Sequence, residues 1–170
     1  NGILPPNIAR CEAGQKYLLV VAITNRTDIP VSAEKMLILR PRNLFLGIGC
    51  KRGKSKEEIE TAILDFLKNN RRSIFSIRRL SSIGLKAKEK GIVDFCGSRG
   101  IEFVTYPAEA IKLIEGRFNS SEFVKKVTGV GSVAEACAIL AGEHSRLVCP
   151  KTVYNGITLA LAEEERSYYI

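Results

Sequence analysis

The sequence has few of the residues that build metal sites and disulfide frameworks. Its 170 residues include one histidine, and the number of cysteines is odd. The cysteines are widely scattered and form no C-x-x-C pair; they are Cys11, Cys50, Cys96, Cys137 and Cys149. Without paired cysteines or clustered histidines, neither a zinc site nor a disulfide framework is indicated. We therefore expect five reduced, mostly buried thiols and no metal bound by the chain itself.

The sequence also lacks a hydrophobic run of membrane length. The continuous apolar run near the N-terminus, residues 18–23, is far shorter than the roughly 20 residues of a spanning helix. The residues before it are polar and contain prolines, whereas a secretory signal begins with a basic head. These absences predict a cytoplasmic protein without a membrane partner. Because the chain starts at Asn1 rather than at methionine, we interpret this start as internal or artificial.

Basic residues outnumber acidic ones. Lysine and arginine total 26 against 18 acidic residues, a formal charge of +8, which favours an anionic partner through long-range attraction. A nucleic acid, a phosphate ester, an anionic membrane surface or a polycarboxylate would each satisfy this charge, and so would plain solvation of lysine-rich faces. Aromatic residues do not interleave with the basic run as base stacking requires, so we expect no nucleic-acid partner.

The length and the 45% hydrophobic content predict one full-sized core and an appendage. Residues 17–24 have the pattern of a buried strand and residues 35–40 that of a second strand, with a polar loop between them. We expect residues 1–43 to form a linker and a strand hairpin, the tail of a preceding region whose edge pairs with the main sheet. Residues 44–170 then form the main domain.

The main domain opens with a strand, a glycine turn and a capped helix. Residues 43–50 are an apolar run that ends in glycines, and a basic turn follows at residues 51–54. Ser55 and Glu58 have the spacing of a capping box, and apolar residues then recur at helical spacing. This order of elements is typical of an α/β unit.

Strands and helices continue to alternate along the chain. The predicted elements are a strand at 76–83, a helix at 89–99, a strand at 101–106, a helix after Pro107, a short helix from Ser121, a helix capped by Ser132 and Glu135, and a terminal hairpin at 146–161 that turns at Asn155-Gly156. The pattern predicts a three-layer α/β/α sandwich with a mixed, mostly parallel sheet whose last strand runs antiparallel.

The segment GIGCKRGKS at residues 47–55 is the strongest candidate for ligand binding. A P-loop needs four residues before its Gly-Lys-Ser end, but Gly49 leaves three and Gly47 leaves five, and the dinucleotide spacing fails as well. A general anion cradle fits better, because the glycines admit close approach, the first helical amides lack partners and the helix dipole favours negative charge. Lys51, Arg52 and Lys54 add positive charge. The alternative is a tight turn at Gly47, Gly49 and Gly53 with solvated cations.

Other candidates lie after later strands. Gly129, Gly131 and Ser132 repeat the glycine turn before a helix, either as a second ligand contact or as a turn between helices. Lys86 and Glu89 follow a strand end, where they would act as a substrate cation and a proton acceptor unless they are only a solvated face. Cys50 lies where a helix N-terminus and cations lower a thiol's pKa, although a small buried residue is the more frequent role. His144 is expected on a surface loop.

Four segments closely resemble the C-terminal domain of the cobalamin-biosynthesis protein CbiG, the cobalt-precorrin-5A hydrolase family. They are LFLGIGCKRGKSKEEIE at 44–60, LSSIGLKAKEKGI at 80–92, TGVGSVAEACAIL at 128–140 and LVCPKTVYNGITLALA at 147–162. The resemblance extends from residue 44 to residue 162. The family also includes the small companion protein of the aerobic B12 pathway, and its anaerobic members carry N-terminal and central regions besides this domain.

This resemblance implies a role in opening the lactone of cobalt-precorrin-5A with release of acetaldehyde. The partner would be an anionic tetrapyrrole whose carboxylates lie near the cations of this chain, and cobalt would arrive bound in that substrate, with no cofactor of the chain's own. Glu89 is the candidate base, and the candidate substrate-binding residues are Gly47, Gly49, Cys50, Lys51, Arg52, Gly53, Lys54, Lys86, Gly129, Gly131, Ser132 and Lys151. A non-catalytic module that binds or carries the corrinoid intermediate stays open as the alternative. Contact with other enzymes of the pathway and homodimer formation also stay open.

The cysteine pattern gives a direct test. Unfolding the protein without reductant and titrating its thiols is expected to find five free groups, because scattered, unpaired cysteines have no disulfide partner. A titration that finds fewer than five would contradict this prediction.

Overall fold

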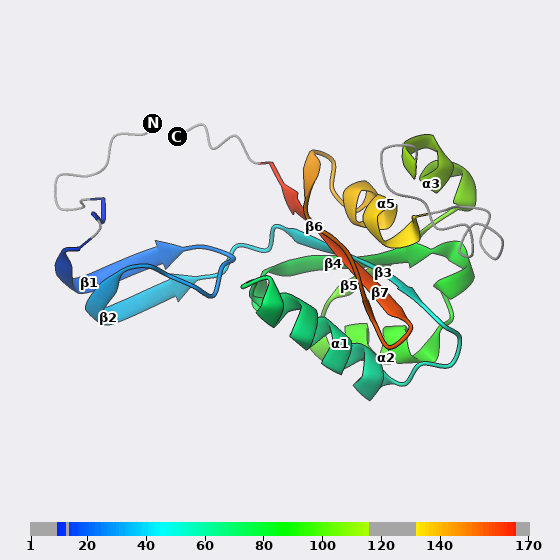
Figure 1. Ribbon diagram of the computed structural model, residues 1–170, viewed down its shortest axis with the longest axis horizontal. Coiled ribbons are helices and arrows are strands. Elements are labelled where there is room, and N and C mark those ends of the chain that lie inside the picture. The colour runs from blue at the N-terminus through cyan, green and yellow to red at the C-terminus, as the bar shows by residue number, and fades with distance from the viewer. Residues whose placement is uncertain (1–9, 13, 116–131, 166–170) are drawn as a thin grey trace.

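The computed structural model describes residues 10–12, 14–115 and 132–165 (Figure 1). Its elements in chain order are β1 (Lys16–Ile23), β2 (Ser32–Leu39), β3 (Leu44–Cys50), α1 (Lys56–Asn69), the 3-10 turn η1 (Ile74–Ser76), β4 (Ile77–Ile83), the 3-10 turn η2 (Gly84–Lys86), α2 (Lys90–Arg99), β5 (Glu102–Tyr106), α3 (Ala108–Glu115), α5 (Val133–Leu140), β6 (Ser145–Tyr154) and β7 (Ile157–Glu164). None of the described helices is both long and apolar enough to span a membrane.

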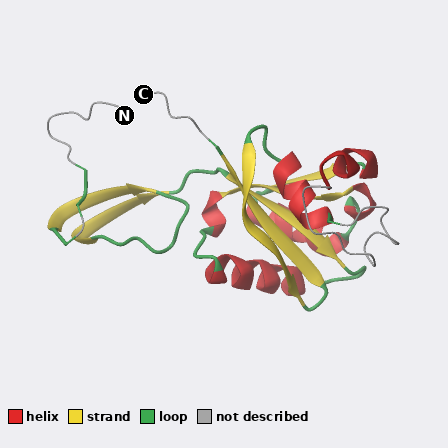
Figure 2. Ribbon diagram, turned by 45° about the horizontal axis from the view of Figure 1, so that its top comes forward, coloured by secondary structure: helices red, strands yellow, loops and turns green. Residues whose placement is uncertain are grey.

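The main domain contains a five-stranded sheet in the order β5-β4-β3-β7-β6. Strands β3, β4 and β5 are parallel, and β7 runs antiparallel to both β3 and β6, so four of the five strands point the same way. Helices α1 and α2 cover one face of the sheet, whereas α3 and α5 lie on the other (Figures 1 and 2). The predicted three-layer sandwich with a mixed, mostly parallel sheet is therefore confirmed.

Local sequence signals explain most of these elements. β3 is buried on both sides because its apolar run lies between helical layers. α1 begins with the predicted capping box, in which the Ser55 hydroxyl accepts from the Glu58 N–H and the Glu58 carboxylate accepts from the Ser55 N–H. The turn between β6 and β7 has positive φ at Asn155 (44°) and Gly156 (77°), the conformation for which Asn-Gly is favoured. The terminal hairpin is thus confirmed.

The N-terminal strands correct three expectations. β1 and β2 do not form a hairpin: they pair in parallel, with Lys16 opposite Ser32 and Ile23 opposite Leu39, in a separate two-stranded sheet that does not join the main one. The strand predicted as buried is largely exposed, since Leu18 is 74% exposed and only Val20 within β1 is buried.

The connection between the two strands explains the parallel pairing. Instead of turning back tightly, it is bound to the segment after α1: the Thr27 N–H donates to the Arg71 carbonyl (2.9 Å) and the Ser73 N–H donates to the Asn25 carbonyl (2.8 Å). The buried Asn25 side chain also donates to Asn43 (3.0 Å) and to Glu163 (2.9 Å). These contacts fix residues 25–27 to the main domain, so the chain must run back before β2 begins (Figure 2).

A close approach between β3 and α5 sets the position of α5. A Cβ at Gly47 would lie 1.8 Å from the carbonyl oxygen of Ala134, so this position has room only for hydrogen. Gly49, two residues later, would place a Cβ 4.0 Å from its nearest neighbour, Thr158. Gly47 therefore serves helix packing, whereas Gly49 could carry a methyl group.

These two glycines make a matched pair for mutation. Gly47→Ala is expected to lower the free energy of unfolding by about 3 kcal/mol or more, because the clash is with backbone atoms that cannot move aside independently. Gly49→Ala should change it by less than about 1 kcal/mol. Urea unfolding of both variants measures the difference. Equal stabilities for the two variants would contradict the close approach of α5.

Candidate functional site

The candidate site lies where the parallel strands end. We call this region the carboxyl edge; it comprises residues 50–55, 84–90, 106–108, 132–135 and 150–157. Because β3, β4 and β5 are parallel, their last residues share one edge, and the helices that follow them begin there. α5 also begins there, since its first turn packs over Gly47 and its end lies near Phe45, earlier in β3.

The turn after β3 is held from two sides. The Lys51 N–H donates to the Gly156 carbonyl (3.0 Å), which ties the turn to the β6–β7 hairpin. The Gly53 N–H donates to Glu89 Oε1 (2.7 Å), which ties it to the start of α2. Gly53 has φ of 80°, a conformation that side chains disfavour. The segment of residues 47–53 lies at a strand carboxyl end, as predicted, but one of its amides already has an internal carboxylate partner.

Glu89 and Lys86 form a largely buried ion pair beside this turn. Lys86 Nζ lies 2.8 Å from Glu89 Oε2, and the two side chains are 15% and 11% exposed. Burial raises the pKa of Glu89, but the bonds from Lys86 and Gly53 outweigh it, so that the pKa is below its ordinary value. An ionised carboxylate with both oxygens bonded is a poor proton acceptor. The role of Glu89 as a base stays a prediction, and its geometry favours a clamp between two loops.

The cations of the turn differ in how exposed they are and in whether they form an ion pair. Lys54 is only 14% exposed and pairs with Glu58 at 2.7 Å. Lys51 and Arg52 are exposed, and neither has an ion pair within the described residues. Glu89 reaches the turn from the start of α2, so an acid that is distant in the sequence lies beside these charges. Lys51 and Arg52 are therefore the most accessible cations of the turn.

Cys50 ends β3 and is half-buried. Burial raises the pKa of its thiol although the Lys86 ammonium lowers it, so the thiol stays protonated at neutral pH. Burial likewise raises the pKa of both Cys96 and Cys137 to about 12. All five cysteines are free, in agreement with the prediction. The expected lowering of the Cys50 pKa does not occur, because desolvation exceeds the effect of the nearby cations.

At the start of α5, Glu135 and Lys151 come together. The capping box expected between Ser132 and Glu135 is absent, since Ser132 makes no side-chain cap bond. Instead the Ser132 hydroxyl donates to Glu135 Oε2 (2.6 Å), and Glu135 Oε1 accepts from the Lys151 N–H (3.2 Å). In the sequence, the feature that points to a special role for Glu135 is that it is a single acid in an otherwise apolar helix. The glycine pair at 129 and 131 and the short helix expected from residue 121 lie outside the described residues.

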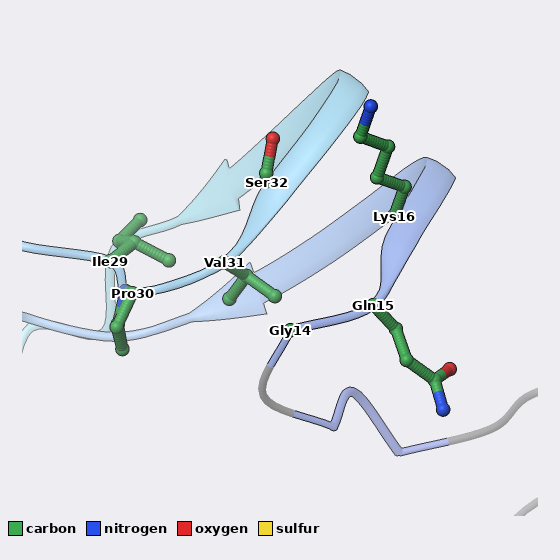
Figure 3. A pocket seen from close by; sticks show the side chains of 7 residues that line it. All are labelled: Gly14, Gln15, Lys16, Ile29, Pro30, Val31 and Ser32. Atoms are coloured by element: carbon green, nitrogen blue, oxygen red, sulfur yellow. The ribbon is translucent and has the colours of Figure 1, made fainter.

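The histidine and one of two hollows lie away from this site, whereas the second hollow borders it. His144 is exposed at the opposite edge, as expected of a surface loop. Among the described residues, no group of three or more histidines, cysteines and acids could hold a metal ion. Of two open hollows in the described part, one of about 470 Å³ lies beside β1 and β2, where Lys16, Val31 and Ser32 line it (Figure 3). The other, of about 420 Å³, lies between α1 and the β6–β7 turn.

Comparison with known proteins identifies the family. Residues 44–162 match the family described as "Cobalamin synthesis G C-terminus". The chain belongs to this family. It is 33% identical to a cobalt-precorrin-5A hydrolase of Priestia megaterium, over 76% of this chain and 34% of that protein. Its role lies in cobalamin biosynthesis.

Two solved structures share the fold of this chain. CobE, a protein of the cobalamin biosynthetic pathway, is 28% identical with a TM-score of 0.69, and the match covers 74% of this chain and 94% of CobE. A cobalamin biosynthesis protein G homologue from Sulfolobus solfataricus has the same fold at 22% identity and a TM-score of 0.56, over 97% of this chain and 48% of that one. The chain spans less than half the length of the curated relatives it matches.

The Glu89 clamp predicts a pH-dependent contribution to stability. Because its pKa is lowered on folding from about 4.5, the ionised carboxylate stabilises the fold above that pH and loses this effect as the pH falls through the folded pKa. Glu89→Gln should therefore lower the free energy of unfolding by about 1 to 2 kcal/mol at pH 7. The deficit should shrink below about pH 4.

Urea unfolding at several pH values measures this difference, with the exposed Glu57→Gln as the matched control. A deficit for Glu89→Gln that stays constant with pH would show that the ion pair does not contribute.

Proposed function

We propose that this domain binds an anionic cobalt-precorrin at its carboxyl edge, as part of a cobalt-precorrin-5A hydrolase that opens the lactone of a corrin precursor with release of acetaldehyde. The names of the curated relatives support the pathway step. The observation that carries the binding role is the gathering of helix starts and exposed cations at one edge.

Four helices of the described part, α1, α2, α3 and α5, begin at the carboxyl edge. The first turn of a helix has backbone N–H groups without intrahelical partners and a partial positive charge, which favours anions. Lys51 and Arg52 add two full positive charges that are exposed to solvent. Together these groups provide positive potential over a broad area rather than in a narrow pocket, which suits a large ligand with several negative groups.

Corrin precursors carry acetate and propionate carboxylates around a wide ring, so they match such a surface. We propose that Lys51 and Arg52 make the first charge-assisted contacts with these carboxylates. Lys54 and Lys86 are already paired with Glu58 and Glu89, and in this proposal they shape the turn and add to its potential. Cobalt enters this proposal only as a part of the substrate.

Hydrolysis of the lactone also needs a base, a water molecule and donors for the developing oxyanion. The turn amides are suitable donors. Both buried or half-buried carboxylates of the described edge, Glu89 and Glu135, have hydrogen bonds on each oxygen. We therefore propose that the catalytic site is completed by other parts of the longer hydrolases, of which this chain spans 34% to 45%.

The alternative is a non-catalytic module that binds or carries the corrinoid intermediate. It is favoured by the CobE match, which covers 94% of that chain, so the domain there stands almost alone. Incubation with cobalt-precorrin-5A and an assay for acetaldehyde separates the two functions. Release by this chain, or by a full-length relative only when its counterpart of this domain is present, supports the hydrolase function. Release by the relative without that domain favours the carrier function.

We also propose that β1 and β2 are the tail of a preceding region. Several large apolar residues of these two strands are exposed to solvent, including Leu18, which is 74% exposed, and Ile23, which is 69% exposed. The Sulfolobus match includes both strands and leaves about half of that longer chain for a further region. The CobE match leaves little of CobE to form such a pair. An adjoining region that covers these strands would remove the apolar surface from water.

Binding at the turn is tested with Lys51→Ala, Arg52→Ala and Lys54→Ala combined in one chain. Affinity for uroporphyrin III, a tetrapyrrole with acetate and propionate carboxylates, is expected to fall at least about tenfold, because each lost charge-assisted contact costs on the order of 1 to 3 kcal/mol. Added salt should weaken binding by the parent chain. Fluorescence titration at low and high salt measures both effects.

A control chain with Lys16→Ala, Lys35→Ala and Lys68→Ala removes the same charge from exposed positions elsewhere. It should bind nearly as tightly as the parent. If the turn variant binds as tightly as the parent at both salt concentrations, the turn is only a structural connection.

A further inference from the structure

Glu135 is the one charged residue of α5, a helix whose other residues are alanine, valine, isoleucine, leucine and cysteine. It is only 5% exposed. Burial of a carboxylate costs several kcal/mol unless hydrogen bonds or an opposite charge offset it. The groups that contact the Glu135 carboxylate therefore indicate its role. They are the Ser132 hydroxyl and two groups of Lys151, its backbone N–H and its ammonium.

The first partner is a backbone group at an irregularity in β6. Cys149 lies opposite Leu161 and Thr152 lies opposite Leu159. Between these two pairs β6 advances by three residues and β7 by only two, so β6 has one extra residue there. Such a bulge interrupts the ladder of hydrogen bonds and changes the direction of a side chain. Within it, the Lys151 N–H donates to Glu135 Oε1 at 3.2 Å. The carboxylate thus takes the place of a strand partner for that amide.

The second partner is the side chain of the same lysine. Lys151 Nζ lies 4.0 Å from Glu135 Oε2, and the Lys151 side chain is 28% exposed. The Ser132 hydroxyl donates to the same Oε2 at 2.6 Å, which fixes the rotation of the carboxylate. One carboxylate therefore contacts both the backbone and the ammonium of Lys151, a geometry that sets where this cation lies.

We propose that Glu135 is a positioning residue, which holds the β6 bulge and directs the Lys151 ammonium toward a substrate carboxylate at the carboxyl edge. An ammonium has three donors, so a 4.0 Å ion pair with Glu135 is compatible with a further bond to an anionic ligand. This inference rests on the proposed function, because it needs an anionic substrate at the carboxyl edge, and it uses Lys151, which the sequence resemblance makes a candidate substrate-binding residue. It adds Glu135, which lies on the face of the sheet opposite α1 (Figure 1).

Variants that change either the length or the charge of the Glu135 side chain distinguish a positioning role from a purely electrostatic one. Glu135→Asp keeps the charge but shortens the side chain by one methylene, so it no longer reaches the Lys151 N–H. Glu135→Gln removes the charge but keeps an oxygen at the same reach. Glu135→Asp should weaken binding of uroporphyrin III about tenfold, as Lys151→Met does. Glu135→Gln, which keeps the bond to the Lys151 N–H but loses the ion pair, should weaken it by less, about threefold.

A double-mutant cycle completes the test. If Glu135 acts through Lys151, Glu135→Asp should cause no further loss in a Lys151→Met chain, because contacting residues that act together are not additive. Glu57→Asp, at an exposed position on α1, is the matched control and should leave binding unchanged. Melting temperatures identify the variants that fold.

The outcomes distinguish this inference from the proposed function. If the parent binds and the Lys51, Arg52 and Lys54 variant does not, but Glu135→Asp binds like the parent or adds its loss independently of Lys151, the inference is overturned and the proposed function stands. If the parent does not bind at all, both fall. Should Glu135→Asp not fold, NMR of the parent decides: uroporphyrin III must shift the Lys151 side-chain signals, and unshifted signals would overturn the inference.

Discussion

The contact between α5 and β3 is the constraint on which the candidate site depends. A side-chain carbon at Gly47 would lie 1.8 Å from the Ala134 carbonyl oxygen, so the helix lies directly on the strand. This close packing brings Ser132 and Glu135 beside β6, where Glu135 meets Lys151. Gly47, which the sequence suggested as a ligand contact, therefore acts through packing, and the proposed binding surface forms around it.

Charge compensation divides the residues of the edge into two groups. Glu58, Glu89 and Glu135 each engage a lysine of the same edge, so Lys54, Lys86 and Lys151 have internal carboxylate contacts. Lys51 and Arg52 stay exposed to solvent. The paired groups keep the loops in place, because a largely buried ion pair with further hydrogen bonds is costly to break. In the proposed function, exposed Lys51 and Arg52 supply the attraction for an anion.

Much of the fold could be predicted because its signals are local. The Ser55–Glu58 capping box, the Asn155-Gly156 turn and the apolar run of β3 each depend on a few neighbouring residues. The parallel pairing of β1 and β2 could not, since it depends on contacts between residues 25–27 and 71–73, far along the chain. The site shows the same division: its cations were evident in the sequence, whereas the bond from Gly53 to Glu89 and the turning of Glu135 toward Lys151 arise only when distant segments meet.

The central claim is that the carboxyl edge is the surface that meets an anionic tetrapyrrole. Backbone amide shifts of the whole chain, recorded by NMR as uroporphyrin III is added, test it most directly. Binding at the carboxyl edge should give shifts that concentrate at residues 49–55, 84–90, 132–135 and 150–156, with little change at residues 71–73 and 144–146 of the opposite edge. Shifts confined to the opposite edge, or to the hollow beside β1 and β2, would contradict it.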